Sequence, residues 1–224
     1  SKTDLENPST EEDKSTSDET ADTAGICSNE YYPINTDNPR KYKVTGSSSN
    51  SYTLTQKKVG ENAFSETRAF GSNTNISSSW ACTGEGIRNA EFNNRGEFSQ
   101  GNFKMETIES SGITFPKEWE LGKKWSSNYK VKANIKAGPV SGSGGGTVKI
   151  DSEIVAMDES VEVPGGSYKT AKVSSVLVMN ITAQGMKIPA RKINMTIWLA
   201  PKVGIVKQTV KGSFGNETVE YNGN

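Results

Sequence analysis

Alternation of apolar and polar side chains over long stretches is the feature that most limits how this chain can fold. In residues 129–137 every odd position is apolar, and the even positions hold Lys130, Lys132, Asn134 and Lys136. A period of two residues buries one set and leaves the other in water, which is typical of an antiparallel strand. No window in residues 27–224 keeps apolar residues at helical spacing over three turns. The sequence therefore predicts a mainly β fold.

The second half of the chain predicts a meander of six or seven strands over residues 126–222. We expect Gly138–Gly146 to be a long flexible loop, and Pro164-Gly165-Gly166 to be a tight turn between two strands. Six candidate strands in the first half are separated by Ser, Asn and Gly clusters. They span residues 40–46, 51–60, 63–71, 76–84, 86–93 and 103–110. Together these strands predict an antiparallel meander that forms a curved sheet, half-barrel or sandwich with little helix.

Residues 1–26 differ in composition from the rest of the chain. They carry eight carboxylates against two lysines, so the formal net charge of zero combines −6 on this segment with +6 on residues 27–224. The segment has no aromatic residue and only Leu5 and Ile26 as large aliphatics. It cannot bury enough apolar surface to offset the entropy of ordering, so we expect it to be disordered.

These properties suggest how the chain is organised. Residues 1–26 are predicted to form a disordered acidic tether, and residues 27–224 a single β domain. A weak internal sequence repeat raises the alternative of two similar halves, about 30–113 and 114–224. The chain opens at Ser1 without an initiating Met, and a polar leash of this kind follows the lipidated cysteine in bacterial lipoproteins. The alternative is an ordinary disordered terminus. No run of about 18 apolar residues is present.

The chain has two cysteines, Cys27 and Cys82. In an exported protein an even number of cysteines favours a disulfide, and two free buried cysteines are the alternative. A disulfide closing this loop would stabilise the fold by about 4 kcal/mol in the chain-entropy model. It would also fix the point where the tether leaves the domain.

The absence of histidine excludes several kinds of chemistry. Without an imidazole there is no Ser-His-Asp or Cys-His base and no histidine metal site. Glu118 and Glu120, on either side of Trp119, are the best local pair for carboxylate-based hydrolysis, but a charged exposed loop explains them better. The glycine run at 142–146 lacks the lysine of a phosphate loop and leads into a strand. We therefore expect no cofactor, no metal and no enzyme activity.

Large apolar side chains outside the expected turns are candidates for a ligand-binding surface. The residues that could line an apolar cavity on a concave sheet face are Trp80, Trp125, Met179, Met195 and Trp198. The same residues would equally fill a solid core. Lysine-rich strand faces could meet anionic lipid headgroups, although a solvated face explains them as well. The basic excess is modest and lacks interleaved aromatics, so nucleic acid is not an expected partner.

Six different short motifs lie along residues 30–210. They are Tyr31-Tyr32-Pro33-Ile34, Tyr42-Lys43-Val44, Trp80-Ala81-Cys82-Thr83-Gly84-Glu85-Gly86-Ile87, Pro116 to Trp125, Val163-Pro164-Gly165-Gly166-Ser167-Tyr168, and Trp198-Leu199-Ala200-Pro201-Lys202-Val203-Gly204-Ile205-Val206-Lys207. In this combination the chain resembles a widespread group of uncharacterised bacterial exported proteins and lipoproteins. The resemblance implies a curved-sheet fold, related to lipoprotein-carrier half-barrels, in the cell envelope. It brings no catalytic residues.

The preferred hypothesis is a non-catalytic domain of the bacterial cell envelope, on the periplasmic side or at the cell surface. A lipid anchor upstream of residue 1 would hold it to the membrane, and it would bind an apolar or lipidic ligand or an envelope protein. The first alternative is a surface adhesion or scaffold module that contributes only contacts. The second is a histidine-free hydrolase that uses carboxylates.

Overall fold

The computed structural model describes residues 25–47, 50–71, 74–92, 103–137, 140–187, 189–212 and 215–224. Every regular element among them is a β-strand. In this part of the chain no helix is long and apolar enough to cross a membrane. The predicted disordered tether lies outside the described residues, apart from Gly25 and Ile26, and it stays a prediction.

Fourteen strands make up the described part of the fold. They are β1 (Arg40–Gly46), β2 (Tyr52–Lys58), β3 (Ala63–Phe70), β4 (Asn75–Cys82), β5 (Gly86–Asn89), β6 (Phe103–Gly112), β7 (Phe115–Pro116), β8 (Lys124–Ala137), β9 (Val140–Val163), β10 (Gly166–Ala183), β11 (Met186–Lys187), β12 (Arg191–Ala200), β13 (Gly204–Gly212) and β14 (Gly215–Tyr221). All of them belong to one antiparallel sheet in the order β6-β8-β9-β10-β12-β13-β14-β1-β2-β3-β4-β5-β7, with β11 paired to β10.

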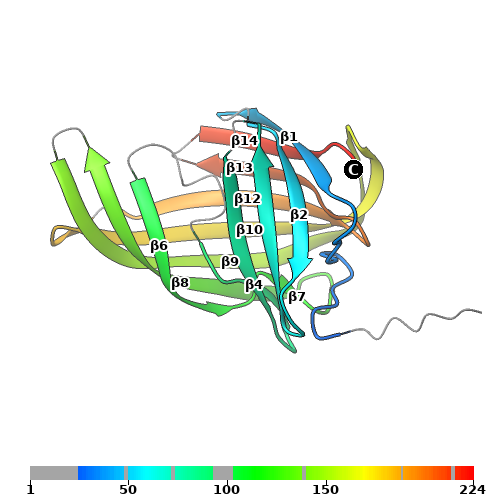
Figure 1. The fold of residues 1–224 in the computed structure, drawn as a ribbon, viewed down its shortest axis with the longest axis horizontal. Coiled ribbons are helices and arrows are strands. Elements are labelled where there is room, and N and C mark those ends of the chain that lie inside the picture. The colour runs from blue at the N-terminus through cyan, green and yellow to red at the C-terminus, as the bar shows by residue number, and fades with distance from the viewer. Residues whose placement is uncertain are drawn as a thin grey trace, which may run out of the picture.

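The sheet folds back over itself. Strands β1 to β4 cross in front of the long strands β9, β10 and β12 (Figure 1). We call β1–β5 and β7 the short layer, and β6, β8–β10 and β12–β14 the long layer. The two layers are continuous because β14 pairs with β1, with Tyr42 opposite Tyr221 and Val44 opposite Val219.

The predicted fold class is confirmed. The mainly β, antiparallel, curved-sheet architecture and the meander in the second half are both present. The candidate strands of the first half correspond to β1–β6, and the tight turn at Pro164-Gly165 separates β9 from β10. Alternation was a reliable guide because each layer buries one face against the other and exposes its opposite face.

The expected flexible loop at Gly138–Gly146 is wrong for residues 140–146. Strand β9 begins at Val140, and Gly144, Gly145 and Gly146 pair with β8 on one side and β10 on the other. A Cβ on Gly146 would lie 1.9 Å from the Asn180 carbonyl oxygen, and one on Gly145 would lie 2.9 Å from that of Val131. Besides forming flexible loops, glycine can lie within a strand where neighbouring backbones approach closely, and these glycines do so here.

Three clusters of buried apolar side chains hold the layers together. One covers the concave face of the long layer and includes Met105, Tyr129, Leu177 and Met179. A second packs the two layers against each other, with Phe64, Trp80 and Phe115 against Ile154, Val173 and Leu199. The third lies at the bend of the sheet where β1 pairs with β14, and it includes Tyr42, Val44, Val219 and Tyr221.

The close approach at Gly146 gives a testable prediction. We expect Gly146→Ala to destabilise the protein by about 1–3 kcal/mol, because the added methyl group forces β9 and β10 apart. Gly84→Ala is the matched control, since a Cβ at Gly84 has no atom within 4 Å. Chemical denaturation followed by circular dichroism measures both. Equal stability of the two variants would show that the strand pairing at Gly146 is wrong.

Candidate functional site

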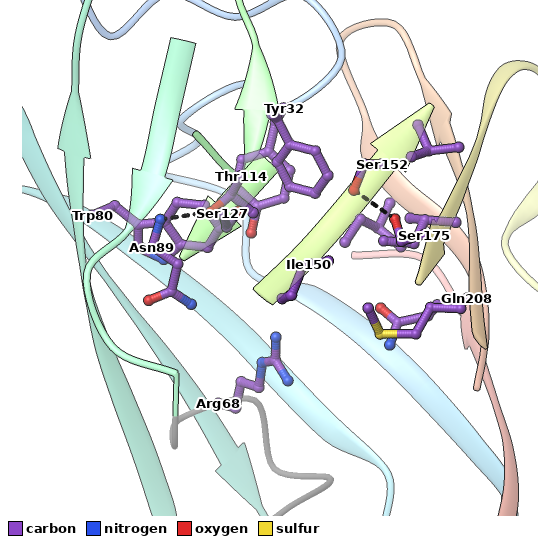
Figure 2. Close-up of a pocket in the computed structure, with 15 residues that line it drawn as sticks. Tyr32, Arg68, Trp80, Asn89, Thr114, Ser127, Ile150, Ser152, Ser175 and Gln208 are labelled. Carbon is purple, nitrogen blue, oxygen red and sulfur yellow. Dashed lines mark hydrogen bonds between the residues drawn. The ribbon is translucent and has the colours of Figure 1, made fainter. Parts of the chain in front are cut away.

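A small cavity lies between the two layers. Its volume is about 40 Å³, which is enough for about three water molecules. Figure 2 shows Arg68, Trp80 and Asn89 on the short layer facing Ser152, Ser175 and Gln208 on the long layer across this space. Together with these six, the lining residues are Tyr32, Thr114, Phe115, Ser127, Ile150, Val173, Met195, Ile197 and Ile205. The lining is therefore a mixture of polar and apolar groups.

The polar groups come from positions where alternation points the side chain inward. On β3, the inward set is Phe64, Glu66 and Arg68, and the first two are 1% exposed. On the long layer, Ser152 and Ser175 are opposite each other, and their hydroxyl oxygens are 2.8 Å apart. A core built for stability alone would place apolar side chains here, because burying polar groups costs free energy unless they are hydrogen-bonded.

We call this set of inward polar residues the polar belt. Its members are Gln56, Glu66, Arg68 and Asn89 on the short layer, and Ser127, Ser152, Ser175 and Gln208 on the long layer. Several of them are held by specific contacts. The Ser127 hydroxyl donates to the Ile113 carbonyl at 2.7 Å, and the Asn89 carbonyl accepts from the Tyr129 hydroxyl at 3.1 Å. The belt is therefore an ordered part of the interior.

Glu66 is the buried carboxylate of the belt. Its Oε2 accepts a short hydrogen bond from the Tyr32 hydroxyl, and a longer one from Gln56 Nε2 at 3.4 Å. Arg68 Nη2 lies 3.9 Å from Oε1, which has no hydrogen-bond partner among the described residues. Burial and the neighbouring carboxylate raise the pKa of the Tyr32 phenol well above its usual range, so Tyr32 remains a neutral donor.

Tyr32 belongs to a segment without regular structure, residues 25–39, which we call the strap. Its ring stacks on Trp80 and on Phe115, with centroid distances of 5.1 and 4.9 Å, and it forms one wall of the cavity. The predicted disulfide is present and joins Cys27 at the start of the strap to Cys82 at the end of β4. The strap is thus attached to the short layer both covalently and through its tyrosine.

Asn29 is the third attachment of the strap. Its side-chain oxygen accepts hydrogen bonds from the backbone N–H of Tyr31 at 3.2 Å, that of Tyr32 at 3.0 Å, and Trp119 Nε1 at 3.2 Å. Its amide nitrogen donates to the Pro116 carbonyl at 2.8 Å. One side chain therefore shapes the strap and ties it to the β7 end of the sheet. This explains why an asparagine is 5% exposed.

The chemistry available in the cavity is recognition by hydrogen bonding. The described lining offers a guanidinium, two amides and several hydroxyls, and it contains no Asp or Glu side chain. Glu118 lies in an exposed loop, where it pairs with Lys123 at 3.5 Å, outside the cavity lining. Among the described residues, no group of three His, Cys, Asp or Glu side chains could hold a metal ion. The arrangement suits the binding of a polar group.

The five residues predicted to line an apolar site are not gathered in one place. Trp80 and Met195 line the cavity, and Met179 lies in the cluster on the concave face of the long layer. Trp125 donates to the Thr114 carbonyl at 3.0 Å and lines a separate surface hollow. Trp198 packs beside the β1–β14 cluster and donates to Glu159 at 3.0 Å. A shared role for all five stays a prediction.

Sequence reasoning missed the polar belt. A signal was available in two places. Ser152 and Ser175 interrupt runs of inward apolar residues. Glu66 and Arg68 are at alternate positions after the apolar Phe64, so they are expected on the same inward face. Inward polar residues within a clear alternation indicate either a buried network or a binding site. Nothing in the sequence indicates that these strands face each other across the sheet.

Two larger hollows lie on the surface, and one of them is lined partly by the strap. One, of about 660 Å³, is bounded by residues 25–29, 33 and 34 of the strap and by residues 58 and 60–62 around the β2–β3 turn. The other, of about 430 Å³, is lined by Lys117, Lys123, Lys124, Trp125 and neighbouring residues. Val59 and Leu121, in the loops near these hollows, are 64% and 68% exposed.

The fold and the site define a class: one strongly curved antiparallel sheet that closes over a small, partly polar interior. Residues 72–211, more than half of the chain, match the model of the DUF3108-like family, and the chain belongs to this family. A comparison with curated proteins gave no match.

Two solved structures are similar in fold. One is a putative exported protein with a YmcC-like fold from Bacteroides fragilis, with a TM-score of 0.51 and 12% identity over 88% of this chain and 99% of that one. The other is a putative lipoprotein from Parabacteroides distasonis, with a TM-score of 0.50 and 14% identity over 87% of this chain and 98% of that one. The resemblance drawn from the sequence is supported at the level of family and fold.

The buried tyrosines give a prediction about alkaline pH. Burial raises the pKa of Tyr32 and of Tyr42, so both phenols stay neutral in the folded state above pH 10.0, where exposed tyrosines ionise. Their contribution to stability is therefore fully present below about pH 10 and is lost as the pH rises further. Absorbance at 295 nm should show a late step that coincides with unfolding.

The variants Tyr32→Phe and Tyr42→Phe provide the control. Each should remove part of the late absorbance step, because phenylalanine does not ionise. Ionisation of all seven tyrosines in a single step near pH 10, with the sheet still folded by circular dichroism, would contradict the buried positions of Tyr32 and Tyr42.

Proposed function

We propose that this protein is an exported, tethered domain of the bacterial cell envelope that binds an amphipathic ligand between its two layers and performs no chemistry. The ligand class is a single apolar chain with an anionic head group. The polar belt beside the apolar cluster of the long layer is the observation that carries this proposal.

Three observations support the location in the envelope. The two solved structures similar in fold are described as a putative exported protein and a putative lipoprotein. The Cys27–Cys82 disulfide suits an oxidising compartment. The acidic composition of residues 1–26 suits a tether between a lipid anchor and the folded domain.

The layout of the interior supports an amphipathic ligand. Met105, Leu177, Met179 and Met195 belong to one buried apolar cluster along the long strands. Met195 also lines the cavity, where the polar groups begin. Arg68 is the only charged side chain among the described residues that line the cavity, and a guanidinium matches a carboxylate or phosphate group. An apolar chain would lie along the cluster with its head group at the belt.

The size of the cavity limits how binding can occur. A space of about 40 Å³ holds a few water molecules and no acyl chain. The structure is therefore the closed, ligand-free form in this proposal, and binding requires part of the wall to move. The buried polar groups lower the stability of this closed form relative to an apolar core, which makes such movement easier.

A protein partner is the second candidate function. It is favoured by the two surface hollows and by the exposed Val59 and Leu121 beside them. Exposed apolar side chains close to concave surface are typical of a protein-binding site. This candidate needs no movement of the layers.

Ligand binding can be tested by filling the cavity. Ser175→Val places extra apolar volume into the belt, while Ser174→Val makes the same change at the neighbouring exposed position on β10. Native mass spectrometry of gently purified protein should show a co-purifying lipid of one defined mass in the wild type and in Ser174→Val. Ser175→Val should lose at least about 90% of it. Lipid in none of the three, or equal lipid in all three, contradicts a site between the layers.

The partner candidate makes a different prediction. A photo-crosslinking residue at Val59 or Leu121 should give one defined protein adduct in intact cells, because both lie beside the surface hollows. Met186 in the short strand β11 is the control position, since it is 68% exposed and β11 pairs with the end of β10 at Thr182 and Ala183, away from both hollows. The same adduct from position 186, or none from 59 and 121, would count against this candidate.

A further inference from the structure

The strap lies between two spaces. On its inner side Tyr32 forms a wall of the cavity between the layers. On its outer side Cys27, Pro33 and Ile34 line the surface hollow of about 660 Å³ that separates the strap from the β2–β3 turn. A segment that forms a wall of a cavity on one side and borders open space on the other has room to move away from the cavity.

Both ends of the strap are fixed to the sheet. Cys27 is bonded to Cys82, and Arg40 begins β1 and donates from Nη1 to the Val203 carbonyl at 2.7 Å. The residues between them, 28–39, are in no strand and form a loop whose ends are pinned. Compact surface loops of this kind are often functional and open without unfolding of the domain.

A small number of polar contacts keeps the middle of the strap in place. They are the Tyr32–Glu66 hydrogen bond, the contacts of Asn29, the backbone N–H of Asn35 donating to Gln56 at 2.9 Å, and the Lys202 N–H donating to the Glu30 carbonyl at 2.8 Å. Glu66 and Gln56 are inward residues of the sheet that accept hydrogen bonds from the strap. Two members of the polar belt therefore bind the strap in the closed form.

We propose that the strap is a latch: withdrawal of Tyr32 from its slot between Trp80 and Phe115 widens the cavity and admits the apolar chain of the ligand. This inference rests on the proposed function and assigns the control of ligand entry to residues 28–39. The disulfide is the fixed pivot of the movement and stays intact throughout.

The chemistry of the slot fits this role. When the ring of Tyr32 leaves, the space between Trp80 and Phe115 adds an aromatic-walled passage to the cavity. The Glu66 carboxylate and the Gln56 amide then lose their strap partners and become available to water. Closing is favourable because the strap restores these hydrogen bonds and reburies the ring.

The test compares Tyr32→Phe with Tyr42→Phe. Both variants remove a buried tyrosine hydroxyl, but Tyr42 donates to the Ile205 carbonyl at 3.0 Å and does not line the cavity. In Tyr32→Phe we expect hydrogen exchange of the Tyr31 and residue-32 amides, which donate to Asn29, to accelerate roughly tenfold. The association rate of palmitate, followed by native mass spectrometry, should rise by a similar factor. In Tyr42→Phe both quantities should match the wild type.

Two results separate failure of the latch from failure of the proposed function. If palmitate binds the wild type and Tyr32→Phe at the same rate, or Tyr42→Phe accelerates both quantities as much, the latch is wrong and the ligand site remains. If strap exchange accelerates in Tyr32→Phe but no variant binds palmitate, the proposed ligand function fails, and the latch fails with it because there is nothing to admit.

Discussion

The pairing of β14 with β1 is the interaction on which the rest of the structure depends. It joins the last strand of the chain to the first through five residue pairs, from Tyr42–Tyr221 to Gly46–Glu217. Without it, the short layer would be joined to the long layer by the chain connections around β6 and β7, with no strand pairing to hold one layer over the other. Because the sheet is continuous here, its curvature places Phe64 and Trp80 over Val173 and Leu199 and creates the interior. The cavity, the polar belt and the seat of the strap all follow from this closure.

The interior is unusual in what it buries. A two-layered β protein of this size normally fills the space between its layers with apolar side chains, because an uncompensated buried polar group costs about 1–3 kcal/mol. Here Glu66 and Arg68 are on the inward face of β3, and Glu66 Oε1 has no hydrogen-bond partner among the described residues. Buried polar groups that reduce stability are retained where they serve recognition or movement. The Tyr32–Glu66 hydrogen bond links the belt directly to the strap.

Much of the fold could be predicted from the sequence, because alternation reports a strand and its buried face together. The bounds of β1 and the turn at Pro164-Gly165 are examples. The glycines of β9 were misread because a run of glycines indicates a loop locally, whereas here it permits close pairing on both sides. The site was less accessible to prediction. Ser152 and Ser175 can be recognised as inward polar residues, but their position opposite Arg68 depends on curvature. The contacts of Asn29 with Pro116 and Trp119 join residues 87 and 90 positions apart, and no local pattern encodes them.

The position of the disulfide determines how the N-terminal segment can affect the interior. Cys27 lies between the acidic residues 1–26 and the rest of the strap, and its bond to Cys82 connects it to the end of β4. A pull transmitted through the N-terminus therefore reaches β4, in the short layer, before it reaches Asn29 or Tyr32. In the proposed function, a pull on the N-terminal segment would therefore leave the strap in place, and the domain would move relative to its anchor without opening. In the proposed latch, opening would begin at the strap's own contacts, from the side of the adjacent surface hollow or from a ligand that competes for Glu66 and Gln56.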